Sequence, residues 1–141
     1  MTKRRRGERG AELVEMALAL PLLLLVVLSV VDFAFMFQQY LVLTNAAMEG
    51  ARVAVLPGYA PSDAVQRAKA YASAGGVPAP VNAVASAVPL PAPTGSWPGM
   101  QVTVTHEYQF QFLGPMASWF NGSLGSVTLT ARSTVRRQMG S

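Results

Sequence analysis

The feature that most constrains this chain is an uncharged apolar run of sixteen residues, 16–31, with the sequence MALALPLLLLVVLSVV. Asp32 interrupts this run, and the apolar stretch FAFMF at 33–37 then continues it. The core of a bilayer requires about 20 residues of helix. Residues 13–37 can therefore span a membrane if Glu15 and Asp32 lie near the two edges of the span.

Two other interpretations of the apolar run are weaker. A cleaved secretory signal has an apolar core of about 7–15 residues followed by small residues at the cleavage site. Here the run is longer, and the bulky sequence FAFMFQQY follows it. A buried core helix would need a larger surrounding domain than a chain of 141 residues provides. We therefore predict a membrane helix.

The distribution of charge predicts the orientation of that helix. Residues 1–10 contain five basic residues and one acidic residue, whereas residues 11–141 contain six of each. The positive-inside rule then places the N-terminus in the cytoplasm and the C-terminal part on the far side of the membrane, with membrane lipid as a partner. A nucleic-acid interface needs basic residues on a folded face. Because the excess charge is confined to the tail, we expect no nucleic-acid partner.

Few side chains beyond the apolar run could support catalysis. The chain has no cysteine and one histidine, His106, which falls on the apolar face of a predicted strand and is expected to be a hydrogen-bonded core residue. No second His or Cys is present to build a metal site with it. Asp63 and Glu107 are the only acidic residues in 57–141. We therefore expect no enzyme activity, no cofactor and no metal.

The helix is predicted to continue beyond the membrane. Residues 38–56 contain no proline, and Pro57-Gly58 then ends the pattern. Small residues recur at helical spacing on one face, namely Ala47, Gly50, Ala51 and Ala54. Gly50 would cost about 1 kcal/mol relative to alanine in a helix, which close approach of another backbone would justify. We predict one helix over 11–56, roughly 70 Å long.

The remaining residues predict a small domain with both helix and strand. Residues 62–74 have the pattern of a short amphipathic helix with Ser62 as N-cap and an inner face of Ala64, Val65, Ala68, Tyr71 and Ala72. The segment 77–99 is rich in proline, and within it 81–88 predicts a weak edge strand, because prolines confine strands to edges.

Two further segments, 100–112 and 126–136, alternate apolar and polar residues with the period of a half-buried strand. The connection 113–125 is too long for a tight hairpin and predicts a helical turn. The predicted fold class is therefore α+β: a long N-terminal transmembrane and stem helix with a small outer domain of one short helix and an antiparallel sheet of 2–4 strands. That sheet is expected to pack on the outer half of the long helix.

The most informative segment joins the basic tail to the apolar run. Gly10 ends the tail, and Glu15 is the fifth residue after it. A carboxylate near the centre of a membrane helix costs about 2.5–3.5 kcal/mol on insertion scales, and less near its edge, so Glu15 is expected to have a partner. Cleavage after Gly10 would free the α-amine of Ala11, about one helical turn from Glu15, and the carboxylate of one subunit could pair with the amine of another.

Two alternatives remain open at this segment. Gly7 is a rival cleavage site, because its fifth follower is Glu12. Cleavage there would leave Arg9 and Glu12 on the stem and hinder membrane entry, so Gly10 is favoured. Glu15 could also be an interfacial charge that lies among the headgroups.

These residues follow the pattern of type IV-like prepilins, and residues 7–56 resemble the TadE family of minor pseudopilins from tight-adherence (Flp/Tad) pilus systems. The resemblance rests on Gly10, Glu15 and Pro21 with the leucines that follow, on the sequence Glu49-Gly50-Ala51-Arg52, and more loosely on the alternating strands of 100–137. The chain departs from the family at Met16, where an aromatic residue usually follows the glutamate.

The resemblance implies a domain organisation and a function. Residues 1–10 would be a basic prepilin leader, 11–37 the transmembrane helix, 38–56 its outward continuation, and 57–141 a periplasmic domain. The protein would be a minor pilin or pseudopilin of the inner membrane that a prepilin peptidase cleaves between Gly10 and Ala11. Its partners would be other pilin subunits, through helix packing, and the inner-membrane assembly platform of an adhesive pilus.

The same resemblance assigns Glu15 to processing or assembly, and Pro21 is expected to kink the helix by removing one backbone hydrogen bond. Glu49 and Arg52 have the spacing of an i,i+3 ion pair. The alternative function is an uncleaved single-pass membrane anchor with a structural or interaction role.

Overall fold

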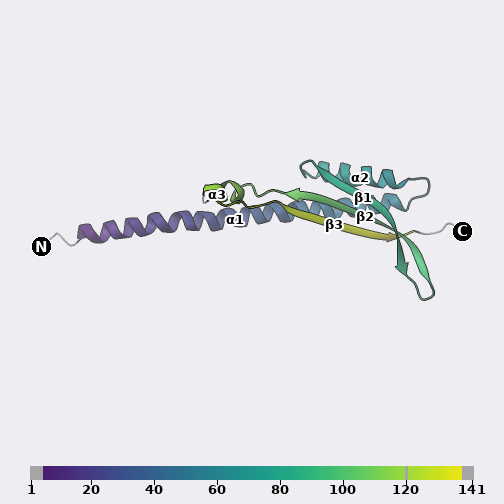
Figure 1. Cartoon of the computed structure of the whole chain (residues 1–141), viewed down its shortest axis with the longest axis horizontal. Helices are drawn as coiled ribbons and strands as arrows, with labels where there is room; N and C mark the ends of the chain where they lie inside the picture. The colour runs from purple at the N-terminus through teal and green to yellow at the C-terminus, as the bar shows by residue number, and fades with distance from the viewer. Residues whose placement is uncertain (1–4, 120, 138–141) are drawn as a thin grey trace. The chain divides into compact units, whose positions relative to one another are not determined.

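The computed structural model describes residues 5–119 and 121–137 and confirms the α+β fold with a long stem helix (Figure 1). A three-stranded antiparallel sheet lies within the predicted range of two to four strands. The elements in chain order are α1 (Arg5–Ala54), α2 (Pro61–Ala74), β1 (Val81–Pro91), β2 (Ser96–Tyr108), α3 (Leu113–Trp119) and β3 (Val127–Arg136).

The chain forms two compact units. The stem unit comprises Met1–Ala34 and Phe110–Gly125, and the sheet unit comprises Phe35–Gln109 and Ser126–Ser141. Helix α1 contributes residues to both units, and α3 belongs to the stem unit although it lies between β2 and β3 in the sequence.

The long helix α1 begins earlier and ends slightly earlier than predicted. It starts at Arg5 rather than at residue 11, and it ends at Ala54 rather than at residue 56. After Ala54 the chain turns, with the Leu56 N–H donating to the Val53 carbonyl at 3.1 Å. The helix continues through Pro21. Residues 1–4 of the predicted leader lie outside the described residues.

The strands of the sheet unit have the order β1-β2-β3. β1 lies at an edge, as predicted for 81–88, but it extends through Pro89 to Pro91, where Pro91 pairs with Ser96. The edge position explains how the strand tolerates these prolines, since an edge strand has one unpaired side. The buried face of β2 confirms the predicted alternation and consists of Met100, Val102, Val104, His106 and Tyr108.

The predicted extent of the second strand was wrong. β2 ends at Tyr108, whereas the alternating pattern continues to residue 112. The amides of Gln111 and Phe112 do not enter the ladder because they donate to the carboxylate of Asp32. The apolar residues at the end of the pattern, Phe110 and Phe112, therefore belong to the stem unit.

The core of the sheet unit forms around the small-residue face of α1. Ala47, Ala51 and Gly50 are buried there. A Cβ added at Gly50 would lie 2.9 Å from the Ala64 carbonyl oxygen, 3.0 Å from the Ala68 Cβ and 3.1 Å from the Val102 Cγ1. Gly50 thus allows both α2 and β2 to approach α1. The predicted packing of the sheet on this face is confirmed, and α2 packs on the same face.

The start of α2 differs from the prediction. The N-cap is Ala60, followed by Pro61 at the first helical position, where proline lacks only a donor that would be unpaired anyway. The Ala60 N–H donates to Asp63 Oδ2 at 2.8 Å. Ser62 lies inside the first turn and is not the cap. Of the residues predicted for the inner face of α2, only the alanines Ala64, Ala68 and Ala72 are buried, and Tyr71 is exposed.

Candidate functional site

The segment with the predicted cleavage site lies near the start of α1. Gly10, Ala11 and Glu15 are all helical and all exposed. A Cβ added at Gly10 would meet no atom within 4 Å. Glycine in a helix interior costs about 1 kcal/mol relative to alanine. Because no described residue occupies the space beside Gly10, packing within the described part of the chain gives no reason for a glycine at this position.

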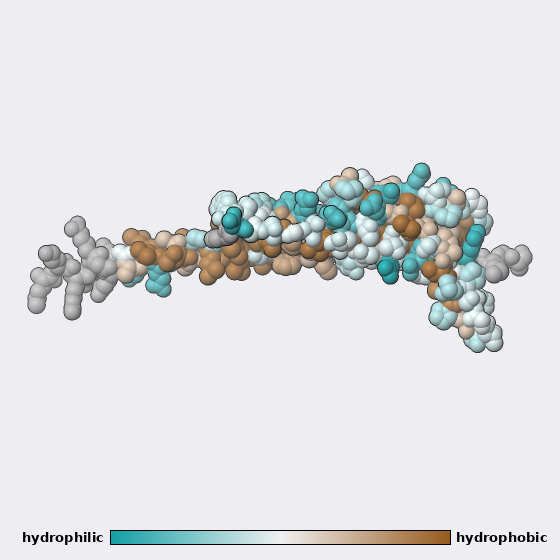
Figure 2. Space-filling model, in the orientation of Figure 1, coloured by the Kyte–Doolittle hydropathy of each residue, from teal (hydrophilic) through white to brown (hydrophobic). Residues whose placement is uncertain are grey.

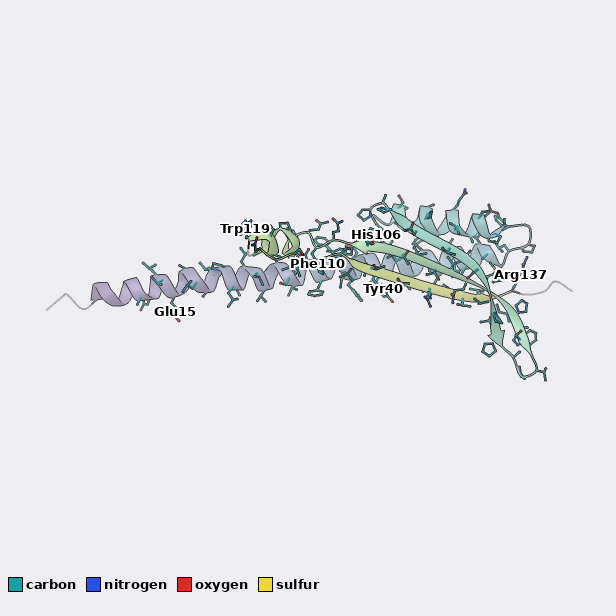
Figure 3. The ribbon with its side chains drawn as sticks, in the orientation of Figure 1. Glu15, Tyr40, His106, Phe110, Trp119 and Arg137 are labelled. Atoms are coloured by element: carbon teal, nitrogen blue, oxygen red, sulfur yellow. The ribbon has the colours of Figure 1, made fainter. Side chains whose placement is uncertain are left out.

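Glu15 projects from the stem helix and has no side-chain partner among the residues that the structure describes. Ala11 and Glu15 are separated by four residues and therefore share a face of α1. Figure 3 shows the Glu15 side chain pointing away from the helix. Among the side chains that the structure describes, none donates to its carboxylate or forms an ion pair with it. A group from outside the chain is therefore needed to compensate this charge if the stem enters a membrane.

The stem around Glu15 presents apolar side chains on all sides. Leu13, Leu18 and Leu22 are each more than 65% exposed, and the surface of this part of α1 is predominantly hydrophobic (Figure 2). The most apolar 18-residue window has a mean hydropathy of 2.6 and no buried residue. By length and composition, α1 can cross a membrane. Pro21 lies within this exposed surface.

Asp32 makes a contact within the stem unit that the sequence did not predict. Its side chain is fully buried. Oδ1 accepts the N–H of Gln111 at 3.0 Å, and Oδ2 accepts the N–H groups of Phe112 at 3.1 Å and Leu113 at 2.8 Å. These amides precede and begin α3, where backbone donors lack partners within the helix. A buried acid inside an apolar run was the available signal, because such a charge needs donors.

A second set of charged residues joins α1 to α2 within the sheet unit. The predicted pair of Glu49 with Arg52 is present at 3.8 Å, but Arg52 is mostly exposed. Arg67 makes the closer contact: its Nη2 and Nε lie 2.9 Å and 3.2 Å from Glu49 Oε1. Arg52 lies nearer the other oxygen, Oε2. This pair lines an open groove of about 530 Å³ between the two helices. Sequence spacing could not identify Arg67 as a partner of Glu49, because the two residues are 18 positions apart in the chain and lie on different helices.

His106 occupies the core position that its strand predicted. It is 6% exposed, and its Nδ1 lies 3.0 Å from the Pro80 carbonyl oxygen. The ring is thus a hydrogen-bonded core residue. Over residues 5–119 and 121–137, no group of three His, Cys, Asp or Glu is placed to hold a metal ion.

Comparison with protein families identifies the segment that contains these features. Residues 10–52 match the family model described as TadE-like protein. Over this segment the chain is similar to the TadE-like family. The match confirms the resemblance inferred from the sequence and includes Gly10, Glu15, Pro21 and the Glu49–Arg52 sequence. The TadE-like family implies a Tad pilus-associated protein with an N-terminal apolar helix suited to membrane anchoring.

The TadE-like segment covers 43 of the 141 residues and ends within α1. No curated protein and no solved structure matches the chain.

Proposed function

We propose that this protein is a minor pilin or pseudopilin of a Tad-type (Flp) pilus. It is inserted in the inner membrane with its N-terminus in the cytoplasm, and a prepilin peptidase removes residues 1–10. The mature stem then packs against other pilin stems on the assembly platform, to initiate or support an adhesive pilus. The observation that carries the proposal is the exposed apolar stem, in which Glu15 is the fifth residue after Gly10. Among the described residues, Glu15 has no side-chain partner and no atom packs against Gly10.

The chemistry of the stem supports this role. Cleavage after Gly10 would create a positive α-amine at Ala11, at the positive end of the helix and one turn from the Glu15 carboxylate. A charge-assisted hydrogen bond from such an amine to the Glu15 of a neighbouring stem would contribute about 1.5–3 kcal/mol. The pair would neutralise both charges as the stems associate in an apolar environment.

Substitutions at Gly10 and Glu15 test the two steps separately. Gly10→Leu places a bulky side chain at the cleaved bond, so the precursor should accumulate in the membrane with its leader attached. Glu15→Gln removes the charge with little change of shape, so insertion and cleavage should proceed while pilus formation is lost. Intact mass and N-terminal sequencing of membrane-extracted protein measure cleavage, and pili are counted by electron microscopy. Gly7→Leu is the matched control and should be cleaved normally.

Each step has a result that would contradict it. Filament-associated protein that begins at Met1 or Thr2 would favour the uncleaved membrane anchor. A mature chain beginning at Glu8 would move cleavage to Gly7 and leave the protein class unchanged. Normal pili assembled from the Glu15→Gln variant would show that Glu15 is only an interfacial charge.

A further inference from the structure

The stem unit contains a contact to which the proposed function assigns no role. The buried carboxylate of Asp32 on α1 accepts backbone N–H groups from three consecutive residues, 111–113, at 2.8–3.3 Å. Beside it, the rings of Phe33 and Phe110 meet edge to face, with centroids 6.3 Å apart. Together these contacts hold the start of α3 against the stem helix.

The segment held in this way is apolar and exposed. The sequence has no charged residue from 108 through 131, between Glu107 and Arg132. Trp119, labelled in Figure 3 at the C-terminal end of α3, is 82% exposed. Phe112 is 37% exposed and Leu124 is 48% exposed. Large exposed apolar side chains in a segment without charge are compatible with contact to a membrane.

The position of Asp32 favours the membrane as the partner. The uncharged run 16–31 spans about 24 Å of helix, slightly less than the roughly 30 Å of a bilayer core. Asp32 therefore lies at the edge of the core when Glu15 lies at the other edge. Tryptophan is enriched at this boundary because its ring is apolar and its N–H needs a polar partner.

We propose that residues 112–119 and 121–124, including α3, form a lipid-facing collar that rests in the headgroup boundary of the bilayer where the stem leaves it. Asp32 fixes the collar to the stem at that depth. Trp119 and its apolar neighbours contact lipid, and the absence of charge in the segment permits this burial. The inference rests on insertion of the stem, which is part of the proposed function, and is independent of cleavage and assembly.

The test uses the full chain in phosphatidylcholine–phosphatidylglycerol vesicles at low protein-to-lipid ratio. Trp97→Phe leaves Trp119 as the only tryptophan. Lipids brominated near the headgroup end of the acyl chain should quench its fluorescence more than lipids brominated near the methyl end, and its emission should shift to shorter wavelength than in water. A control chain with Trp97→Phe, Trp119→Phe and Leu24→Trp reports the stem itself and should show the opposite preference.

The outcomes separate this inference from the proposed function. Unquenched Trp119 with water-like emission, beside a deeply quenched Leu24→Trp stem, would overturn the collar and leave membrane anchoring intact. A stem that lipid does not quench would overturn both. Asp32→Ala in the Trp97→Phe chain tests the fixing contact: the preference of Trp119 for shallow quenching should be lost, and Asp32→Asn, which keeps one acceptor oxygen, should retain part of it. Unchanged quenching in Asp32→Ala would show that Asp32 does not fix the depth.

Discussion

The two halves of α1 are both apolar and both helical, yet they differ in the size and the exposure of their side chains. In the stem unit the helix carries large residues that face outward, and Leu24 is 55% exposed. In the sheet unit one face of the helix is buried and mostly small, with Leu43, Ala46 and Ala47 all 0% exposed, while large residues on the other faces stay exposed. The comparison shows that hydrophobicity alone does not identify a neighbour. Bulky exposed residues favour lipid or other stems as neighbours, whereas small buried residues let α2 and β2 pack closely.

The largest expected effect compares Leu43 with Leu24. Leu43→Ala should lower the free energy of unfolding of the sheet unit by about 2–5 kcal/mol, because it removes a buried side chain and leaves a cavity. Leu24→Ala should leave that free energy unchanged, since Leu24 is exposed in the stem unit. Pulse proteolysis of the full chain in detergent micelles over a urea series measures both variants. Equal losses of unfolding free energy in the two variants would mean that Leu24 contributes as much to the stability of the sheet unit as Leu43 does.

A smaller effect is expected at Gly50, a position in the sheet-unit half of α1 where α2 and β2 approach the helix backbone closely. Gly50→Leu should destabilise the sheet unit by about 1–3 kcal/mol through overpacking, because an added Cβ already lies 2.9 Å from the Ala64 carbonyl oxygen. The same protease assay measures the change. Met48→Leu, two residues away at an exposed position, is the control and should have little effect. Unchanged protease resistance in Gly50→Leu would contradict the packing of α1 on α2 and β2.

The smallest effect concerns the ion pairs of Glu49. Arg67→Ala should cost about 0.2–1 kcal/mol, the usual range for a partly exposed pair, because the side chain of Arg67 is 54% exposed. Arg52→Ala should cost less, since its pair is longer and more exposed. A double-mutant cycle with Glu49→Ala at low and high salt isolates the pair, and salt should weaken it. A larger coupling energy between Glu49 and Arg52 than between Glu49 and Arg67 would show that Arg52 is the stronger partner of Glu49.

Much of the candidate site could be predicted from the sequence, because its signals are local. The order of Gly10, Glu15 and Pro21 indicated the TadE-like segment, and the buried face of β2 followed from alternation over 100–108. Ser62 was wrongly predicted as the cap of α2, because the actual cap uses the backbone of Ala60 and the carboxylate of Asp63. Residue type alone does not distinguish these two arrangements at the start of a helix.

The sequence by itself determined the apolar stem, the small-residue face of α1 and the edge position of β1, since each depends on residue size, polarity or proline within a few turns or strand repeats. The sequence indicated the local Glu49–Arg52 pair, but only the tertiary structure decided the partners of charged groups that lie far apart in the chain. Asp32 bonds to amides about 80 residues away, and Glu49 bonds to Arg67 on another helix. A buried charge requires compensation wherever the fold brings donors to it. The sequence shows only an acid within an apolar run, and the fold both buries Asp32 and supplies the backbone donors at the start of α3.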